Sequence, residues 1–403
     1  MRLNRSVVPL TIGLLFVAAG CRGEAETGPP RPPGPGSPSA AADATPSGVE
    51  PIPVEVAFFE SPDGGEADRP AVTAFQAATL AFSNAAFAGD LPVAVEVVVH
   101  DTGEDASTVA EVAAQVAADP TVVAAIGAPG LDRQTALGDA LHAAGMPWIS
   151  LSGRGADLGR RGWTGWRRMV ADETAQGWVL ADTVEALGMP GGACLMGDGT
   201  AASRSLLRAV ADTYQGAVAL RAVVGEAQGE VTAAAEAAGV SGCGAVVWAG
   251  EGNGAAAVRR QLVEEGLRDV VLIGGDRMRD QGYLDAAGPA AEGTFATCPC
   301  VDLSTSTDLA AQRFIQDYQA EYGLPPGPYA VEAWDAARLL VSAFRAGATT
   351  REGTLAAIAA VTSDEGLAGA YRFDEGGDLA AAKGHVRLYE VAGRRWLEAS
   401  SGA

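Results

Sequence analysis

Three polar side chains in this chain could hold a small molecule, and each follows a short apolar run. Ser152 and Arg154 come after residues 147–151, and Asp276 follows residues 270–273. The hydroxyl and amide of Ser152 can bind a carboxylate or an amide, and the Arg154 guanidinium suits a carboxylate or phosphate through two parallel hydrogen bonds. The Asp276 carboxylate would fix an ammonium or amide group. This chemistry favours binding over catalysis.

Each of the three residues also has a structural interpretation. Ser152 can simply form a turn, and Arg154 can pair with a nearby acid such as Asp157. Asp276 can cap the N-terminus of a helix, since Asp at a strand-to-helix turn commonly does so. The sequence does not choose between these interpretations and ligand binding.

Two further residues extend the candidate group. Glu251 follows the apolar run 245–248, and it offers either a second acidic contact or a partner for Arg154 across a cleft. Tyr329 either packs against an apolar part of the ligand or belongs to a helix interior.

The chain lacks the usual signatures of an enzyme. Its three histidines, His100, His142 and His385, lie far apart in sequence. It contains no G-x-S-x-G, no H-E-x-x-H and no P-loop. We therefore expect a binding protein rather than an enzyme, with no cofactor and no metal.

Strand and helix patterns alternate almost throughout, which predicts an α/β fold with parallel sheets covered by helices on both faces. The pattern restarts after Trp163, so two Rossmann-like lobes are expected. Apolar runs predict strands at 54–59, 93–100, 122–126, 147–151, 193–196, 217–224, 245–248, 270–273, 371–373 and 386–391. Periodic segments predict helices at 71–88, 109–116, 134–144, 174–187, 202–214, 231–238, 255–265, 309–322 and 329–346.

Residues 1–20 are typical of a signal peptide, with two arginines, an apolar core and a small-residue exit. The following run V-A-A-G-C resembles a bacterial lipobox, which implies cleavage before Cys21 and lipid on its sulfur. The alternative is an ordinary signal peptide with a coincidental cysteine. Residues 21–50 are rich in Pro, Gly, Ser and Ala and predict a disordered tether. We expect an extracytoplasmic protein, lipid-anchored to a bacterial membrane.

Charge and length limit the partners and the number of lobes. The formal net charge of −22 makes nucleic acid and anionic lipid surfaces poor partners, because both require clustered basic residues. The roughly 350 residues that follow the tether are long for one core and natural for two lobes.

Four cysteines remain besides Cys21, and export makes disulfides plausible. Cys194 and Cys243 each begin a predicted strand, so a bridge suits them if those strands are neighbours. Cys298 and Cys300 either close a small ring or stay reduced. Zinc is disfavoured because the spacing is not C-x2-C and no histidine lies nearby.

Several segments together resemble the type I periplasmic binding proteins, specifically the branched-chain amino-acid group of ABC-transporter solute-binding proteins. The resemblance covers 52–396 and rests on the order and spacing of its segments. They are D-P-T-V-V-A-A-I-G (119–127), A-G-M-P-W-I-S (144–150), R-R-Q-L-V-E-E-G-L (259–267), A-A-G-P-A-A-E-G-T-F-A-T (286–297), P-G-P-Y-A-V-E-A-W-D-A-A (326–337) and Y-R-F-D-E-G-G-D (371–378).

The resemblance implies two lobes that close on a ligand about three crossovers, near Arg168, Thr297 and Leu367. Lobe 1 would contain 51–168 and 298–367, and lobe 2 would contain 169–297 and 368–403. It further implies a monomer that delivers a small polar ligand, an amino acid or an amide, to an ABC permease. A ligand-sensing module for a signalling partner and a degenerate member that binds nothing are the alternatives.

The resemblance also gives expected positions in the site. The family binds the ligand carboxylate through hydroxyls and amides of the first lobe and the ammonium through a carboxylate of the second. Asp276 matches the acidic position, Ser152 falls at the end of a signature strand, and Tyr329 aligns with an aromatic wall.

Four positions depart from the family pattern. Leu131 occupies the usual hydroxyl position, and Arg154 stands where Thr or Ser is usual. Ala202 replaces a common aromatic residue, and Glu251 stands where Tyr is common. These changes argue against a simple aliphatic amino acid and indicate a larger or more polar ligand, unless Arg154 and Glu251 form an internal ion pair.

Overall fold

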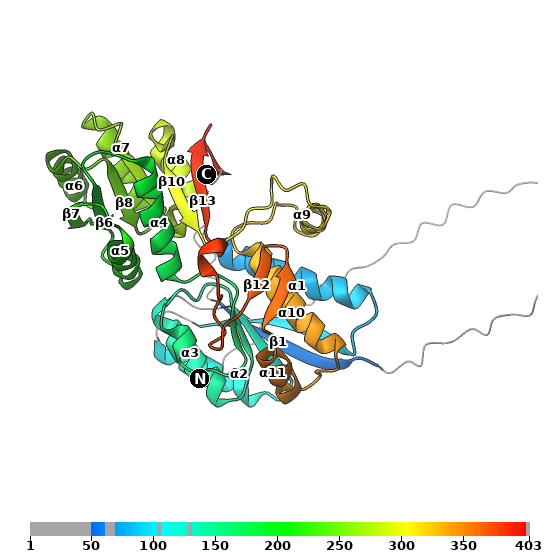
Figure 1. Ribbon diagram of the computed structural model, residues 1–403. Coiled ribbons are helices and arrows are strands. Elements are labelled where there is room, and N and C mark those ends of the chain that lie inside the picture. The colour runs from blue at the N-terminus through cyan, green and yellow to red at the C-terminus, as the bar shows by residue number, and fades with distance from the viewer. Residues whose placement is uncertain (1–49, 61–68, 103–105, 128–130, 400–403) are drawn as a thin grey trace, which may run out of the picture. The chain divides into compact units, whose positions relative to one another are not determined.

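The computed structural model describes residues 50–60, 69–102, 106–127 and 131–399. The predicted signal peptide, Cys21 and nearly all of the tether lie outside the described residues. Within them, two large sheets and one small hairpin carry the helices, in an alternating α/β order (Figure 1).

The first large sheet has the strand order β2-β1-β3-β4-β5, and all of its strand pairs are parallel. Its strands are β1 (Ile52–Glu60), β2 (Val93–Asp101), β3 (Val122–Gly127), β4 (Trp148–Ser150) and β5 (Trp166–Arg168). Every residue of β3 is buried, as a strand covered on both faces requires.

Neighbouring residues of β1 point to opposite faces of the first sheet, so each face has its own core. Phe58 belongs to the cluster with α1 (Arg69–Phe87), α9 (Leu309–Tyr322) and α10 (Ala330–Arg345). Phe59 belongs to the cluster with α2 (Ala106–Ala118) and α3 (Leu131–Ala143). This alternation follows from the two-residue period of a strand.

The second large sheet has the order β14-β13-β10-β9-β8-β6-β7. It is parallel from β10 to β7, and β13 and β14 join it antiparallel. The strands are β6 (Ala193–Gly197), β7 (Val218–Val223), β8 (Ala245–Ala249), β9 (Val271–Gly274), β10 (Phe295–Cys298), β13 (Arg387–Ala392) and β14 (Arg395–Glu398).

Helices cover both faces of the second sheet as well. One cluster packs Trp248 against α6 (Gln228–Ser241), α7 (Gly252–Glu264) and α8 (Gln281–Ala287). The other packs Val247 against α4 (Glu173–Leu187) and α5 (Ala201–Thr213). The expected pair of α/β lobes is therefore present, each with its own sheet.

The structure places the third crossover later than the sequence suggests. Tyr371 and Leu379 pack in the core of the first sheet, so the chain returns to the second sheet only after Leu379. The cause is Asp335 of α10, whose buried carboxylate accepts hydrogen bonds from Leu367 N at 2.8 Å, Ala368 N at 2.9 Å and Tyr371 OH at 3.1 Å. These bonds hold the hairpin of β11 (Ser363–Gly366) and β12 (Gly369–Arg372) on the first lobe.

Cys194 is bonded to Cys243, with a Cα–Cα distance of 5.8 Å. Cys194 lies in β6 and Cys243 just before β8, and these two strands are neighbours, with Cys194 opposite Val246. Cys298 is bonded to Cys300 where the chain leaves the second sheet. In the described part of the chain, no helix is both long enough and apolar enough to cross a bilayer.

Candidate functional site

Strand ends of both lobes supply the candidate site. The loop after β4 carries Ser152 and Arg154. A short helical turn, Asp276–Met278, follows β9 and begins with Asp276. Tyr329 directly precedes α10. In open α/β sheets, ligands bind outside the carboxyl ends of the strands, and Ser152, Arg154 and Asp276 lie there.

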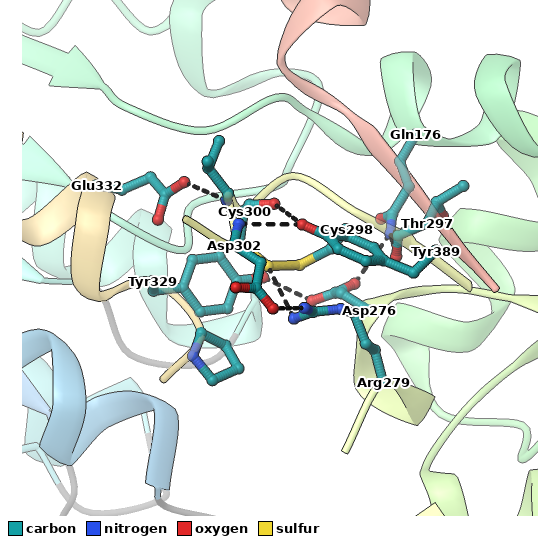
Figure 2. Close-up of a disulfide and its surroundings, with 12 residues drawn as sticks. Gln176, Asp276, Arg279, Thr297, Cys298, Cys300, Asp302, Tyr329, Glu332 and Tyr389 are labelled. Carbon is teal, nitrogen blue, oxygen red and sulfur yellow. Dashed lines mark hydrogen bonds and ion pairs between the residues drawn. A yellow bond between two sulfur atoms is a disulfide. The ribbon is translucent and has the colours of Figure 1, made fainter. Parts of the chain in front are cut away.

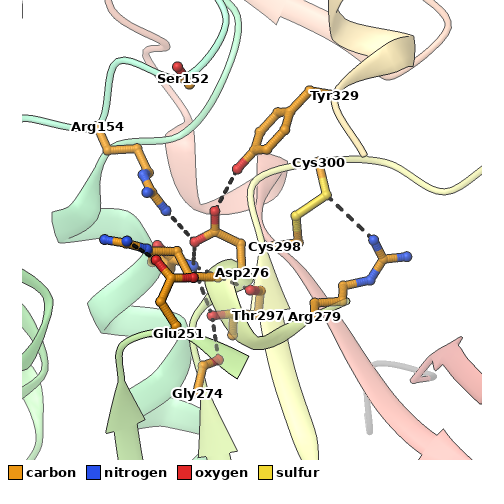
Figure 3. Close-up of polar contacts among 12 residues, drawn as sticks. Ser152, Arg154, Glu251, Gly274, Asp276, Arg279, Thr297, Cys298, Cys300 and Tyr329 are labelled. Atoms are coloured by element: carbon orange, nitrogen blue, oxygen red, sulfur yellow. Dashed lines mark hydrogen bonds and ion pairs between the residues drawn. A yellow bond between two sulfur atoms is a disulfide. The ribbon is translucent and has the colours of Figure 1, made fainter. Parts of the chain in front are cut away.

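Arg154, Asp276 and Tyr329 meet at one point (Figure 3). The Asp276 carboxylate accepts a hydrogen bond from the Arg154 guanidinium through Oδ1 and from Tyr329 OH through Oδ2, the latter at 2.6 Å. Gln176 of α4 donates from Nε2 to the same Oδ1 at 3.0 Å. The ion pair joins the two lobes and is largely buried, with 17% of the Arg154 side chain and 8% of the Asp276 side chain exposed.

The local electrostatics keep this arginine charged. Burial alone would lower the pKa of Arg154, but the Asp276 carboxylate and other nearby groups raise it above its ordinary value. Burial, followed by the Asp276 carboxylate, raises the pKa of Tyr329 well above its ordinary value, so its phenol remains a donor. The cluster is a charged pair with a neutral phenol.

The backbone around Arg154 is held by side chains that the sequence did not single out. Arg168 is 1% exposed and donates to Gly153 O at 2.7 Å and Gly155 O at 2.8 Å. Its guanidinium also pairs with Asp378 at 2.5 Å. Gly153 is required here, because an added Cβ would collide with the Ser150 hydroxyl.

Tyr329 is held in a conformation that side chains rarely adopt. Its φ is 63°, in the left-handed region that favours glycine. Such a backbone persists only where its surroundings enforce it, and it is found disproportionately at binding sites. The phenol of Tyr329 reaches Asp276 from this position.

Arg154 does pair with an acid, but the acid is Asp276 and not Asp157, whereas the N-cap interpretation of Asp276 does not hold. Asp157 pairs with Arg161 at 3.0 Å rather than with Arg154. The residue at the N-cap of the turn is Gly275, and Asp276 uses its carboxylate for the interlobe contacts instead.

The sequence allowed an ion pair between Glu251 and Arg154, but the structure does not show this pair. The Glu251 carboxylate accepts from the Arg277 guanidinium, and 58% of its side chain is exposed. Ser152 lies in the loop beside Arg154, where its carbonyl accepts from Gln134 Nε2 at 3.1 Å. Leu131 begins α3, and its side chain lies outside what the structure describes.

A small pocket with a cavity volume of about 10 Å³, room for about one water molecule, adjoins the ion pair on the second-lobe side. The lining residues are Arg154, Glu173, Gln176, Ala202, Ser203, Leu206, Ala249, Gly250, Gly275, Asp276 and Arg277. Three buried oxygens of these residues have no hydrogen-bond partner among the residues that the structure describes, namely Glu173 Oε2, Gln176 Oε1 and Ser203 Oγ. Unpaired buried oxygens in a pocket indicate a place for hydrogen-bond donors.

The second crossover lies next to Asp276 and Tyr329 (Figure 2). The Cys298–Cys300 disulfide packs against Tyr389 of β13 and against Tyr329. Arg279 lies over the Tyr389 ring, 3.7 Å from its centroid, and pairs with Asp302 at 3.0 Å. The crossover is therefore fixed to both lobes beside the residues that meet at Asp276.

No group of His, Cys, Asp and Glu side chains within the described ranges is arranged to hold a metal ion. The site instead offers hydrogen-bonding and charged groups for an organic ligand. Nothing in its arrangement resembles a nucleophile oriented by a base.

Comparison with known proteins gives one family. The model of the family described as "Periplasmic binding protein" matches residues 56–395. No curated protein sequence matches at a significant level.

Several solved structures have the same fold. The branched-chain amino acid transporter substrate-binding protein LivJ of Streptococcus pneumoniae, solved with isoleucine, is 19% identical with a TM-score of 0.72, covering 87% of this chain and 100% of its own. The leucine-binding protein LivK of Thermotoga maritima is 21% identical with a TM-score of 0.71, covering 86% and 98%. A solute-binding protein from R. palustris, solved with benzoate, is 19% identical with a TM-score of 0.70, covering 87% and 95%.

Proposed function

The chain belongs to the periplasmic binding protein family, and from this premise we propose that it binds a zwitterionic amino acid between its lobes. The observation that carries the proposal is the buried Arg154–Asp276 pair. Its two charges complement those of an α-amino acid, so a ligand can insert between them. The ligand carboxylate then pairs with Arg154 and the ligand ammonium with Asp276, and no charge is left unpaired.

The ion pair also explains how the ligand would act on the lobes. Arg154 of the first lobe bonds Asp276 of the second directly. A ligand that bridges the two charges adds contacts to both lobes and favours a ligand-bound closed form. We propose that an ABC permease recognises this closed form, and that a lipid on Cys21 holds the protein at the membrane.

Ligands that lack one charge test the proposal directly. Isothermal titration should detect binding of free α-amino acids, whereas their N-acetyl derivatives and carboxamides should bind at least about 30-fold more weakly. Each derivative leaves one buried charge of the protein unpaired, which costs about 2–5 kcal/mol. Equal affinity for a free amino acid and both of its derivatives would contradict the insertion of a zwitterion.

Substitution of the two charges should have matching effects. Asp276→Asn and Arg154→Gln should each weaken binding about 100-fold, because each removes one charge partner of the ligand. The matched control is Arg161→Gln, which breaks the exposed pair with Asp157 and should change affinity less than about twofold. Wild-type affinity in Asp276→Asn would place the ligand elsewhere.

Thermal-shift and partner-binding measurements separate the alternative functions. If no amino acid raises the melting temperature, the Arg154–Asp276 ion pair closes the site permanently and the chain is a non-binding member of the family. If an amino acid binds but the closed form engages a signalling protein rather than a permease, the chain is a sensor module.

A further inference from the structure

We propose that the pocket on the second lobe receives a protonated nitrogen at the end of the ligand's side chain, so the ligand is an amino acid with a basic side chain. This inference rests on the proposed function, because it takes the α-amino and α-carboxyl groups to lie between Asp276 and Arg154. It adds a second subsite, formed by Glu173, Gln176 and Ser203.

Each unpaired atom of the pocket can accept a hydrogen bond, and the Ser203 hydroxyl can also donate one. Glu173, Gln176 and Ser203 are 4%, 0% and 3% exposed, and each has one side-chain oxygen without a partner. An ammonium group has three N–H donors, and a guanidinium has five. A basic side chain can therefore satisfy all three oxygens, whereas an aliphatic side chain would leave each of them buried and unpaired.

The orientation of the Gln176 amide follows from its own contacts. Its Nε2 donates to Asp276 Oδ1 at 3.0 Å and to Thr297 Oγ1 at 3.2 Å. Both contacts require the nitrogen on that side, so the Gln176 oxygen is the atom left for the pocket.

The charges around the pocket decide the sign of the ligand group. Two guanidinium groups line it, and each already has an acidic partner, Asp276 for Arg154 and Glu251 for Arg277. Glu173 has a hydroxyl contact with Ser205, but its Oε2 is unpaired. Burial raises the pKa of Glu173, and the nearby Arg154 offsets this effect only in part, so a cation in the pocket would stabilise the Glu173 carboxylate.

Small residues make room for such a side chain. Ala202, Gly250 and Gly275 form part of the wall. Glu173 begins α4, so its side chain is fixed at the start of a helix whose N-cap is Asp172. The subsite therefore lies on a rigid element.

The test is isothermal titration of the full-length protein with L-lysine, L-arginine, L-glutamine and L-norleucine, the last being an apolar match for lysine. We expect lysine or arginine to bind at least about 10-fold more tightly than norleucine, with glutamine between them. The variants Glu173→Gln and Ser203→Ala should each reduce the ratio of lysine affinity to norleucine affinity. For Glu173→Gln this ratio should fall at least about 10-fold.

The outcomes distinguish this inference from the proposed function. If none of the four amino acids binds, the proposed function fails and this inference fails with it. If norleucine binds as tightly as the basic amino acids, only this inference fails. The comparison on the unaltered protein gives this answer even if a variant does not fold, and circular dichroism identifies such a variant.

Discussion

The double replacement Cys194→Ala/Cys243→Ala should lower the free energy of unfolding of the second lobe by about 4 kcal/mol. The bridge closes a segment with a sequence separation of 49 residues. On the chain-entropy model, a loop of this length restricts the unfolded chain by about 4 kcal/mol. Urea unfolding followed by circular dichroism, with linear extrapolation to water, measures the change.

The second disulfide provides the control. Cys298 and Cys300 are separated by 2 residues, so their bridge restricts the unfolded chain far less. The double replacement Cys298→Ala/Cys300→Ala should therefore lower the free energy of unfolding by less than half as much, although this disulfide lies at the crossover. If Cys194→Ala/Cys243→Ala lowered the free energy of unfolding by less than about 1 kcal/mol, the Cys194–Cys243 bridge would not restrict the unfolded second lobe as we expect.

The repeated βα pattern made most of the fold predictable from the sequence. Buried parallel strands such as β3 and β8 are continuous apolar runs, and the amphipathic helices between them have clear periods. The elements that escaped prediction are short or polar, because their structure depends on tertiary contacts. β5 contains Arg167 and Arg168, and β11 consists of Ser-Asp-Glu-Gly.

The candidate site was predicted in part for the same reason. Arg154, Asp276 and Tyr329 stand at strand or helix ends, where a sequence pattern can place them. Their mutual contacts connect residues more than 50 positions apart, and no local pattern encodes such contacts. Glu173 and Gln176 were missed because they look like ordinary polar residues in the first turn of a helix.

Replacement of Glu332 by glutamine should remove a loss of stability that the wild-type protein suffers as the pH rises. Glu332 lies in α10, is 2% exposed, and accepts a hydrogen bond from Val301 N at 2.7 Å, while its Oε2 has no partner. Burial raises the pKa of this carboxyl from an ordinary 4.5 to about 8, and the neighbouring Asp335 adds to the shift.

The sign of the pH dependence follows from proton binding. Between pH 4.5 and pH 8 the unfolded chain has lost the Glu332 proton, but the folded protein retains it. The unfolded state therefore binds fewer protons, so stability falls as the pH rises. The stabilisation by the protonated group is complete below the unfolded pKa and is lost as the pH passes the folded pKa. The full shift corresponds to about 5 kcal/mol as an upper limit.

The glutamine in Glu332→Gln cannot ionise, so this variant should not lose stability through this group as the pH rises. The free energy of unfolding of Glu332→Gln, minus that of the wild type, should therefore increase by several kcal/mol from pH 5 to pH 9. The new amide donors bring a cost of about 1–3 kcal/mol at every pH, because the buried Oε2 position has no acceptor. The difference in slope, rather than the absolute stability, is therefore the measurement. Urea unfolding of both proteins across this range gives it, with the exposed Glu264→Gln on α7 as the control for charge alone. Parallel pH profiles for Glu332→Gln and the wild type would mean that Glu332 is ionised in the folded protein at neutral pH.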